Sequence, residues 1–196
     1  MVALFCCLLP AFSITGEHPV LIISSYNPDA GRTSGNISDF MDASVQKALK
    51  PLGLLDRIIF FEKDATPTVA DAARLLGCEP RLIAKTMAVK LHSGPALIVL
   101  AGDARVEGKK FRKRFQESMK FIPSEALLEL TGHGPGSMTP IGAKQGVPIY
   151  FDASLRSLPE LYPAGGTAET VVRLTLTELE KAAPPDEWVD LAREGE

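Results

Sequence analysis

The chain has 196 residues, of which 45% are hydrophobic and 23% charged, and its formal net charge is −3. This composition is typical of a globular protein and excludes disordered, collagen-like and multispanning membrane chains. The acidic balance excludes a wholly basic surface that coats nucleic acid, although it leaves room for a local basic patch. The three cysteines form no CxxC pair and have no histidine cluster at ligand spacing, so we expect a reducing cytoplasmic compartment and no structural metal.

Residues 1–40 differ from the rest of the chain. Their apolar start carries no basic residue before Arg32 and is broken by Pro10, so it lacks the pattern of a secretory signal, and we expect no membrane association. We interpret this segment as an N-terminal extension, disordered or a mis-assigned start, with one short strand over 19–24. A domain over residues 41–192 is expected to follow it. A secreted or membrane-tethered protein is the alternative that the apolar start leaves open.

The predicted elements after residue 40 alternate. Helical periodicity with start and stop signals predicts helices over residues 41–52, 66–77, 108–117 and 123–130, and a last helical region that ends near Trp188. In the second helix, Thr66 is the expected N-cap and Gly77 the expected end. Extended segments are expected over residues 56–62, 84–91, 96–101, 147–152, 160–163 and 170–175. The alternation predicts an α/β (α+β) fold with hairpins.

One lysine lies inside the apolar run over residues 84–91. If this run is a strand, Lys85 shares one face with Met87, Val89 and Leu91, because side chains alternate between the two faces. An ammonium group on an apolar face is costly unless it is paired or opens on a polar cavity, which indicates the mouth of a pocket. The alternative is a strand that begins one residue later, with Lys85 in solvent.

Two glycine-rich segments are candidate ligand loops. Residues 132–142 hold four glycines and two prolines, so their backbone N–H groups can converge on a ligand oxygen, but the GK[ST] ending of a phosphate loop is absent. Residues 162–169 offer Gly165, Gly166 and the hydroxyl of Thr167. A plain surface turn is the alternative for both segments.

A basic run in the helix over residues 108–117 is a candidate RNA-binding surface. Phe111 and Phe115 give this helix an inward stripe, and the positive charges concentrate around it. The alternative is a solvated helix face, because such charge runs are common. The residues of the run are Lys109, Lys110, Arg112, Lys113 and Arg114.

Five motifs follow one another along the chain: IAKTM at 83–87, LIVLAGDARV at 97–106, GPGSMTPIG at 134–142, VPIYFDASL at 147–155 and LYPAGG at 161–166. In this order they resemble the YbaK/EbsC family, a branch of the YbaK/ProX-type aminoacyl-tRNA editing domains. The similarity extends over about residues 41–188, and the ordered set is more specific than any single motif.

This resemblance implies a mixed, barrel-like β-sheet flanked by helices, and a trans-editing hydrolase that deacylates mischarged aminoacyl-tRNA carrying Cys, Ala or a similar small amino acid. The enzyme would need no metal and no cofactor, with a bound water or the substrate's own thiol as the attacking group. Its partners would be aminoacyl-tRNA and an aminoacyl-tRNA synthetase. Lys85 would be the functional lysine. The substrate-binding residues would be Gly136, Ser137, Met138, Thr139, Pro140, Ile141 and Gly142, with Gly165, Gly166 and Thr167 as a second group.

Some positions depart from the family pattern. Ser137 stands where glycine is common and Ile141 where phenylalanine or leucine is common, so the amino-acid preference cannot be transferred. Cysteinyl specificity is therefore one option among several. A non-catalytic module that binds aminoacyl-tRNA or a synthetase is the alternative function, because it would use the same lysine and the same basic helix.

Overall fold

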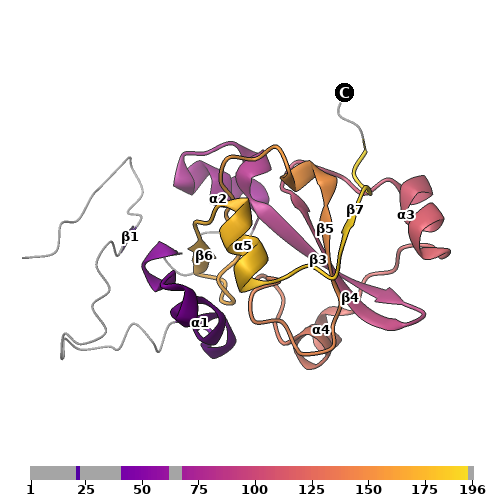
Figure 1. Ribbon diagram of the computed structural model, residues 1–196, viewed down its shortest axis with the longest axis horizontal. Helices are drawn as coiled ribbons and strands as arrows, with labels where there is room; N and C mark the ends of the chain where they lie inside the picture. Colours follow the sequence, from indigo (N-terminus) through magenta and orange to yellow (C-terminus); the bar gives the residue numbers. More distant parts are fainter. Residues whose placement is uncertain (1–20, 23–40, 62–67, 194–196) are drawn as a thin grey trace, which may run out of the picture.

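The computed structural model describes residues 21–22, 41–61 and 68–193. In these ranges, helices and strands alternate along the chain, and short 3-10 turns occur between some of them (Figure 1). The helices are α1 (Ala43–Leu49), α2 (Val69–Leu76), α3 (Gly108–Phe115), α4 (Ser124–Thr131) and α5 (Leu176–Ala182). The strands are β1 (Leu21–Ile22), β2 (Ile58–Phe60), β3 (Ala84–Leu91), β4 (Gly94–Ala101), β5 (Ile149–Asp152), β6 (Thr170–Val172) and β7 (Glu187–Val189).

The strands form two sheets, one with the order β1-β2-β6 and one with the order β3-β4-β5-β7. β3 and β4 are an antiparallel hairpin, whereas β5 and β7 join the sheet in parallel. Residues 161–164 link the sheets: Ala164 forms a bridge with Val171 of β6, while Tyr162 N–H donates to Leu82 O at 2.8 Å and Tyr162 C=O accepts from Ala84 N–H of β3 at 3.2 Å. The α/β class is confirmed, but the sheet is not closed into a barrel, because this link to β3 is short.

The predicted strand over residues 84–91 is confirmed as β3, and its partner β4 begins at Gly94, two residues before the predicted start. Of the strand predicted over 19–24, Leu21–Ile22 pair with β2, and the other residues lie outside the described ranges. α2 is capped by the Thr68 side chain, which accepts from Asp71 N–H, and ends at Gly77 as predicted. The predicted cap, Thr66, lies outside the described residues.

The prediction of a last helical region ending near Trp188 is wrong. α5 starts at a capping box formed by Thr175 and Glu178 and ends at Ala182. Pro184 and Pro185 stop it, since proline has no N–H for the helical hydrogen bonds. Trp188 lies instead in β7, where its ring meets the Phe151 ring edge to face, with centroids 5.6 Å apart. None of the helices in the described part of the chain is long and apolar enough to cross a bilayer.

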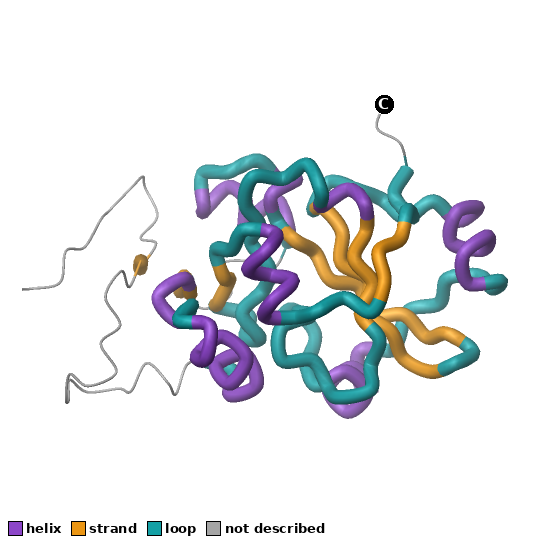
Figure 2. The backbone as a smooth tube through the Cα atoms, viewed as in Figure 1, coloured by secondary structure: helices purple, strands orange, loops and turns teal. Residues whose placement is uncertain are grey.

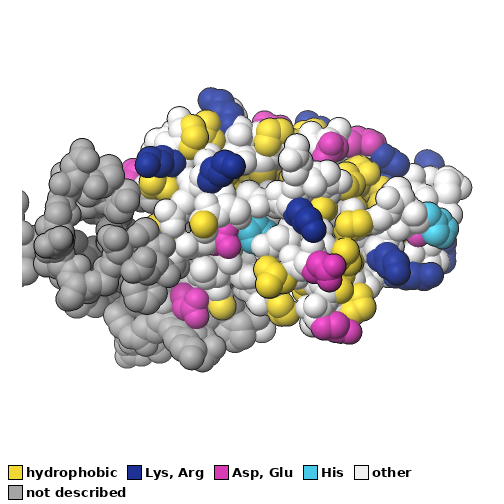
Figure 3. All heavy atoms as spheres, turned by 90° about the horizontal axis from the view of Figure 1, so that it is seen from below, with side chains coloured by type: hydrophobic (Ala, Val, Ile, Leu, Met, Phe, Trp, Pro, Cys, Tyr) yellow, Lys and Arg dark blue, Asp and Glu magenta, His cyan; other side chains and the backbone are white. Residues whose placement is uncertain are grey.

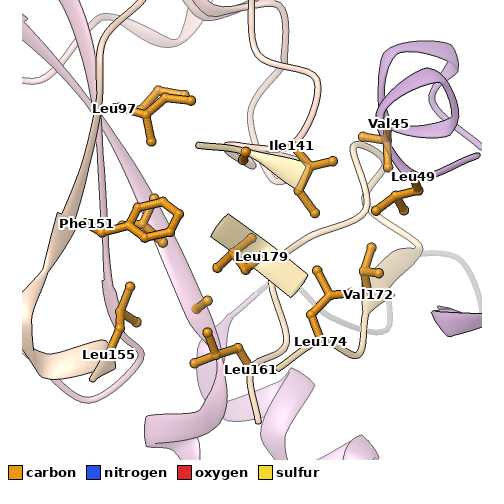
Figure 4. Packing of buried hydrophobic residues seen from close by; sticks show 14 of the residues in the cluster. Val45, Leu49, Leu97, Ile141, Phe151, Leu155, Leu161, Val172, Leu174 and Leu179 are labelled. Atoms are coloured by element: carbon orange, nitrogen blue, oxygen red, sulfur yellow. The ribbon is translucent and has the colours of Figure 1, made fainter. Parts of the chain in front are cut away.

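The sheet β3-β4-β5-β7 has two different faces. Its inner face packs with α1, α5 and the second sheet, and Figure 4 shows side chains from these elements pointing toward one another. Its outer face packs on α3, whose Phe111 is fully buried among residues of β3, β4 and β7. α1 and α3 lie at opposite ends of the molecule (Figure 1), and Figure 2 shows the long loop that connects α4 to β5 on the side of α1.

Candidate functional site

The two predicted glycine-rich segments meet on the first turn of α1. A Cβ on Gly142, which has φ +71°, would lie 2.5 Å from Ser44 Oγ and 2.6 Å from its carbonyl carbon. A Cβ on Gly166, with φ +88°, would lie 2.5 Å from Asp42 Cβ. Only glycine permits these close approaches, so α1 joins the loop over residues 132–142, the glycine loop, to the turn over residues 165–170, the hairpin tip.

Asp42 and Ser44 are residues of the site that the sequence did not point to. The Asp42 carboxylate accepts hydrogen bonds from Ser44 N–H at 2.9 Å and Val45 N–H at 3.1 Å, which caps α1. This capping pattern is the signal in the sequence, but it marks the start of a helix and not its contact with two distant loops.

The hairpin tip is held by its own hydroxyl groups. Thr170 is 2% exposed, and its Oγ1 lies 2.8 Å from Thr167 Oγ1. A Cβ on Gly165 would lie 2.5 Å from Thr170 Oγ1, so the backbone packs directly on this hydroxyl. Thr167 is half-buried, and its hydroxyl is already engaged with Thr170.

Several side chains of the glycine loop form hydrogen bonds within the loop or pack in the core. Ser137 Oγ donates to Gly134 O at 3.0 Å, and Ile141 N–H donates to Thr139 Oγ1 at 3.3 Å. Ile141 is fully buried in the inner core (Figure 4), and Met138 packs against that core. Pro140 is buried, and Gly136 is exposed at a turn with φ +76°. The loop therefore offers backbone groups more readily than side chains to a ligand.

His133 closes the base of the glycine loop. Its Nε2 lies 3.0 Å from Ile141 O, so Nε2 carries the proton, because a carbonyl oxygen only accepts. Nδ1 is then an acceptor, and it is buried with no hydrogen-bond partner in the described residues. Burial lowers the pKa of His133, and the nearby carboxylate of Asp42 acts in the opposite direction.

Lys85 is half-buried and held by a turn of its own sheet. Its Nζ donates to Gly102 O at 3.0 Å and to Ala104 O, both in the turn between β4 and α3. Burial lowers the pKa of Lys85, Asp103 opposes this shift, and Arg105 adds to it. Lys85 is thus neither stranded in solvent nor unpaired.

The hydrogen bonds of Lys85 go to the turn at Gly102 and Ala104 and not to the glycine loop. Met87, Val89 and Leu91, which share the face of Lys85 by alternation, pack in the outer cluster. Ile141 and Met138 pack in the inner cluster with Ala84 and Ala88. Within the described ranges, no hydrogen bond joins Lys85 to the glycine loop. By alternation Lys85 projects from the edge strand β3 on the outer face, and its assignment as the functional residue stays a prediction.

One surface hollow lies at the end of the glycine loop. It has a volume of about 280 Å³ and is lined by residues 143–149 and Asp186. Its lining includes neither Lys85 nor a residue of the hairpin tip. Among the residues that the structure describes, no group of three or more His, Cys, Asp or Glu side chains is arranged to hold a metal ion.

The basic residues of α3 divide into two sets. Lys110 Nζ lies 2.8 Å from both Asp190 Oδ1 and Ala192 O, and the Arg114 guanidinium pairs with Glu187 of β7. Lys109, Arg112 and Lys113 are exposed and have no ion pair within the described part of the chain. Figure 3 looks from the side of α1 and α4, and on this face Lys and Arg side chains stand in small groups among acidic and apolar ones.

The fold and the site define a small α/β domain in which two glycine-rich loops meet on a short helix. The chain belongs to the aminoacyl-tRNA editing domain family, since the model of that family matches residues 63–182. The family resemblance predicted from the sequence is thus confirmed, and the chain is an aminoacyl-tRNA editing domain. α1 precedes the matched range, yet its Val45 and Leu49 are fully buried in the same core.

Individual relatives agree with the family. The uncharacterised protein YwhH of Bacillus subtilis (strain 168) is 31% identical over 133 residues, which are 67% of this chain and 85% of that protein. The proline–tRNA ligase of Shouchella clausii (strain KSM-K16) is 34% identical over 113 residues, which are 56% of this chain but 19% of the ligase. A crystal structure described as a candidate trans-editing enzyme for prolyl-tRNA synthetase matches with a TM-score of 0.69 at 26% identity, covering 79% of this chain and 99% of that one.

Proposed function

We propose that this protein deacylates mischarged aminoacyl-tRNA that carries cysteine, alanine or a similar small amino acid. The observation that carries the proposal is the meeting of the glycine loop and the hairpin tip on α1, in a domain of the editing family. An aminoacyl ester needs backbone donors at its carbonyl oxygen, and rigid glycine-rich turns supply such donors. Similarity to a proline–tRNA ligase and to a candidate trans-editing enzyme for prolyl-tRNA synthetase supports proline tRNA as the RNA and a synthetase as a partner.

The glycine loop holds donors for this reaction. The N–H groups of Gly136 and Gly142 have no hydrogen-bond partner in the described part of the chain, whereas Ser137 N–H donates to Gly134 O at 3.3 Å. Gly136 and Gly142, unlike Ser137, therefore have N–H groups that are ready for a substrate oxygen. One preorganised hydrogen-bond donor to the oxyanion raises the reaction rate by a factor on the order of 10²–10³.

Lys85 would act on the substrate from the edge strand. Its Nζ is bound to two carbonyl oxygens, and a lysine has three N–H donors, so one remains for the ester or for the terminal adenosine end. Water or the thiol of a cysteinyl substrate attacks the carbonyl carbon, and the bond to the ribose oxygen breaks. The ribose oxygen takes up a proton, and a cysteinyl thioester formed on the way is hydrolysed by water.

The ester is already activated, so positioning and polarisation of its carbonyl can carry the reaction without a metal or another cofactor. Treatment with a strong chelator is therefore expected to leave the rate unchanged. A rate that falls with the chelator and returns with added metal would contradict the metal-independent reaction.

The test is a deacylation assay on tRNA charged with Cys, Ala or Ser, with proline tRNA included in the panel. We expect release of at least one amino acid, and a loss of about 100-fold in Lys85→Ala. Lys90→Ala is the matched control, because Lys90 lies on the same strand with an exposed side chain. Release that survives Lys85→Ala removes this lysine from the mechanism. No release from any tRNA by the wild type favours the non-catalytic binding module.

A further inference from the structure

β3 is paired along one edge and open in the middle of the other. The edge of β3 that faces β4 is paired over all eight residues. The opposite edge, here called the free edge, is paired only near its ends. Ala84 N–H donates to Tyr162 O, Lys90 N–H donates to Lys120 O at 2.8 Å, and Ile122 N–H donates to Ala88 O at 3.2 Å. Residues 84, 88 and 90 therefore direct their backbone groups toward the free edge, away from β4.

Thr86 lies between these two pairings. The register between β3 and β4 has no interruption, so the backbone groups of every second residue point the same way. The N–H and C=O of Thr86 therefore also point toward the free edge. Neither group has a hydrogen-bond partner in the described residues. Its Oγ1 is buried and also has no partner there. A buried hydroxyl without a partner is rare in folded proteins, since it costs about 1–3 kcal/mol, and together with the two open backbone groups beside it the Thr86 hydroxyl indicates a ligand position.

One amino acid bound through its ester has the matching groups. In an antiparallel sheet, two opposite residues of a hydrogen-bonded pair exchange both N–H to O=C bonds. An aminoacyl ester carries an α-ammonium donor and a carbonyl acceptor on one residue, so it can occupy the place of such a partner. Along this edge of β3, the open position between the hydrogen bond to Tyr162 and the pairing with residues 120–122 then accommodates a single ligand residue.

We propose that the aminoacyl group pairs with Thr86 as one added β residue, its ester carbonyl accepting from Thr86 N–H and its α-ammonium donating to Thr86 C=O. This inference rests on the proposed function and names its substrate-holding strand. The Thr86 N–H then polarises the carbonyl that is attacked. The side chain of Lys85, the preceding residue, lies on the opposite face of the strand and extends toward the turn at Gly102.

The pairing also sets where the amino-acid side chain lies. Opposite residues of a ladder carry their side chains on the same face, so the substrate side chain lies on the face of Thr86, Ala84 and Ala88. The two alanines are small and buried, and Thr86 Oγ1 is available to a hydroxyl or thiol. The site therefore selects a small L-amino acid, because the D-isomer turns its side chain to the other face.

The test uses an analogue that cannot be hydrolysed, 3′-amino-3′-deoxyadenosine carrying L-alanine in amide linkage. Protein labelled with ¹⁵N-threonine is titrated with it and followed by NMR, with the Thr86 signal assigned through Thr86→Ser. We expect the Thr86 amide to shift downfield and its exchange with deuterium to slow at least tenfold. The D-alanyl analogue and the propionyl analogue, which lacks the ammonium group, are expected to bind at least tenfold more weakly.

A variant tests the same bond from the protein side. Thr86→Pro removes this outward N–H, and proline is tolerated at strand edges. We expect it to lose at least tenfold in affinity for the L-alanyl analogue while its thermal midpoint stays near that of the wild type. If this variant does not fold, the comparison of analogues on the wild type still decides.

The outcomes separate this inference from the proposed function. Deacylation of tRNA together with an unchanged Thr86 amide signal overturns the pairing and leaves the function intact. Analogue binding at Thr86 without deacylation of any tRNA supports the pairing and argues against the enzyme. Binding of the L- and D-alanyl analogues with equal affinity, or of neither, overturns the pairing.

Discussion

The two faces of the sheet β3-β4-β5-β7 differ in how their polar groups are satisfied. The outer face packs on α3 through Phe111 and Phe115, and its charged neighbours Lys110 and Arg114 are paired with residues of and next to β7. The inner side carries the buried atoms without partners in the described residues, Thr86 Oγ1 on β3 and His133 Nδ1 at the base of the glycine loop. Both faces contribute to the hydrophobic core, but the inner side also leaves hydrogen-bonding capacity for a ligand.

The largest effect that tests this division is on the outer face. Phe111 is 0% exposed, so Phe111→Ala is expected to lower the free energy of unfolding by about 4 kcal/mol, measured by urea denaturation. Phe111→Leu, which conserves most of the volume, is expected to cost about 1 kcal/mol. Both folded variants should retain wild-type deacylation per folded molecule. A large loss of turnover in folded Phe111→Leu would show that the outer face takes part in the reaction.

The second effect tests the contact between the glycine loop and α1. Gly142→Ala places a Cβ within 2.7 Å of three Ser44 atoms at φ +71°, and we expect a loss of about 3 kcal/mol in stability. Gly146→Ala is the control, since Gly146 has φ +86° and open space around its Cβ, and it should cost about 1 kcal/mol. Equal losses in the two variants would mean that the loop does not pack on α1 this closely.

The third effect is the dependence of protein stability on pH that His133, on the inner side, is expected to cause. Its pKa in the folded state is lowered from 6.5, so the unfolded state binds the proton more tightly. The stability that neutral His133 contributes is therefore complete above pH 6.5 and is lost as the pH falls through the folded pKa, by up to about 1.4 kcal/mol per pH unit.

His133→Gln is expected to flatten this part of the profile. Glutamine retains an N–H donor for Ile141 O but has no group that takes up a proton in this range. Thermal midpoints measured from pH 7.5 to pH 4.5 check the prediction. A variant that follows the wild-type curve below pH 6.5 would assign the acid sensitivity to other groups.

The smallest effect concerns the exposed set on α3. Reversing Lys109, Arg112 and Lys113 to glutamate is expected to weaken tRNA binding and to lower the slope of log K against log salt by about 1–3, or roughly 0.9 for each phosphate that these side chains no longer neutralise. Arg114→Ala is the control, because its guanidinium is engaged by Glu187. An unchanged slope in the triple variant would leave α3 as a solvated helix.

Local pattern predicted the elements whose signals lie within one stretch of sequence. Alternation between faces and the turn residues at positions 92–95 defined β3 and the hairpin to β4, and they also gave the correct face for Lys85. β7 was missed because it has three residues and depends on distant partners. Its pairing with β5 and the bond from Ile149 N–H to Asp186 Oδ2 at 2.8 Å have no signal near Trp188.

The candidate site was predictable only in parts. The glycines at 142 and 166 indicated special backbone positions, but that both pack on α1 is a property of the tertiary fold. Asp42 could be read only as the cap of a helix. The free edge at Thr86 was not predictable either, because it depends on where residues 120–122 and Tyr162 pair with β3.

The attachment of α3 to the carboxyl-terminal strand has a consequence for how the protein presents charge. Glu187 and Asp190 form ion pairs with Arg114 and Lys110, so this carboxyl-terminal segment neutralises two of the five basic residues of α3. Replacing Glu187 with glutamine and Asp190 with asparagine would make this end of the molecule more cationic without changing a single lysine or arginine of α3. Electrophoretic mobility in native gels would register that change directly.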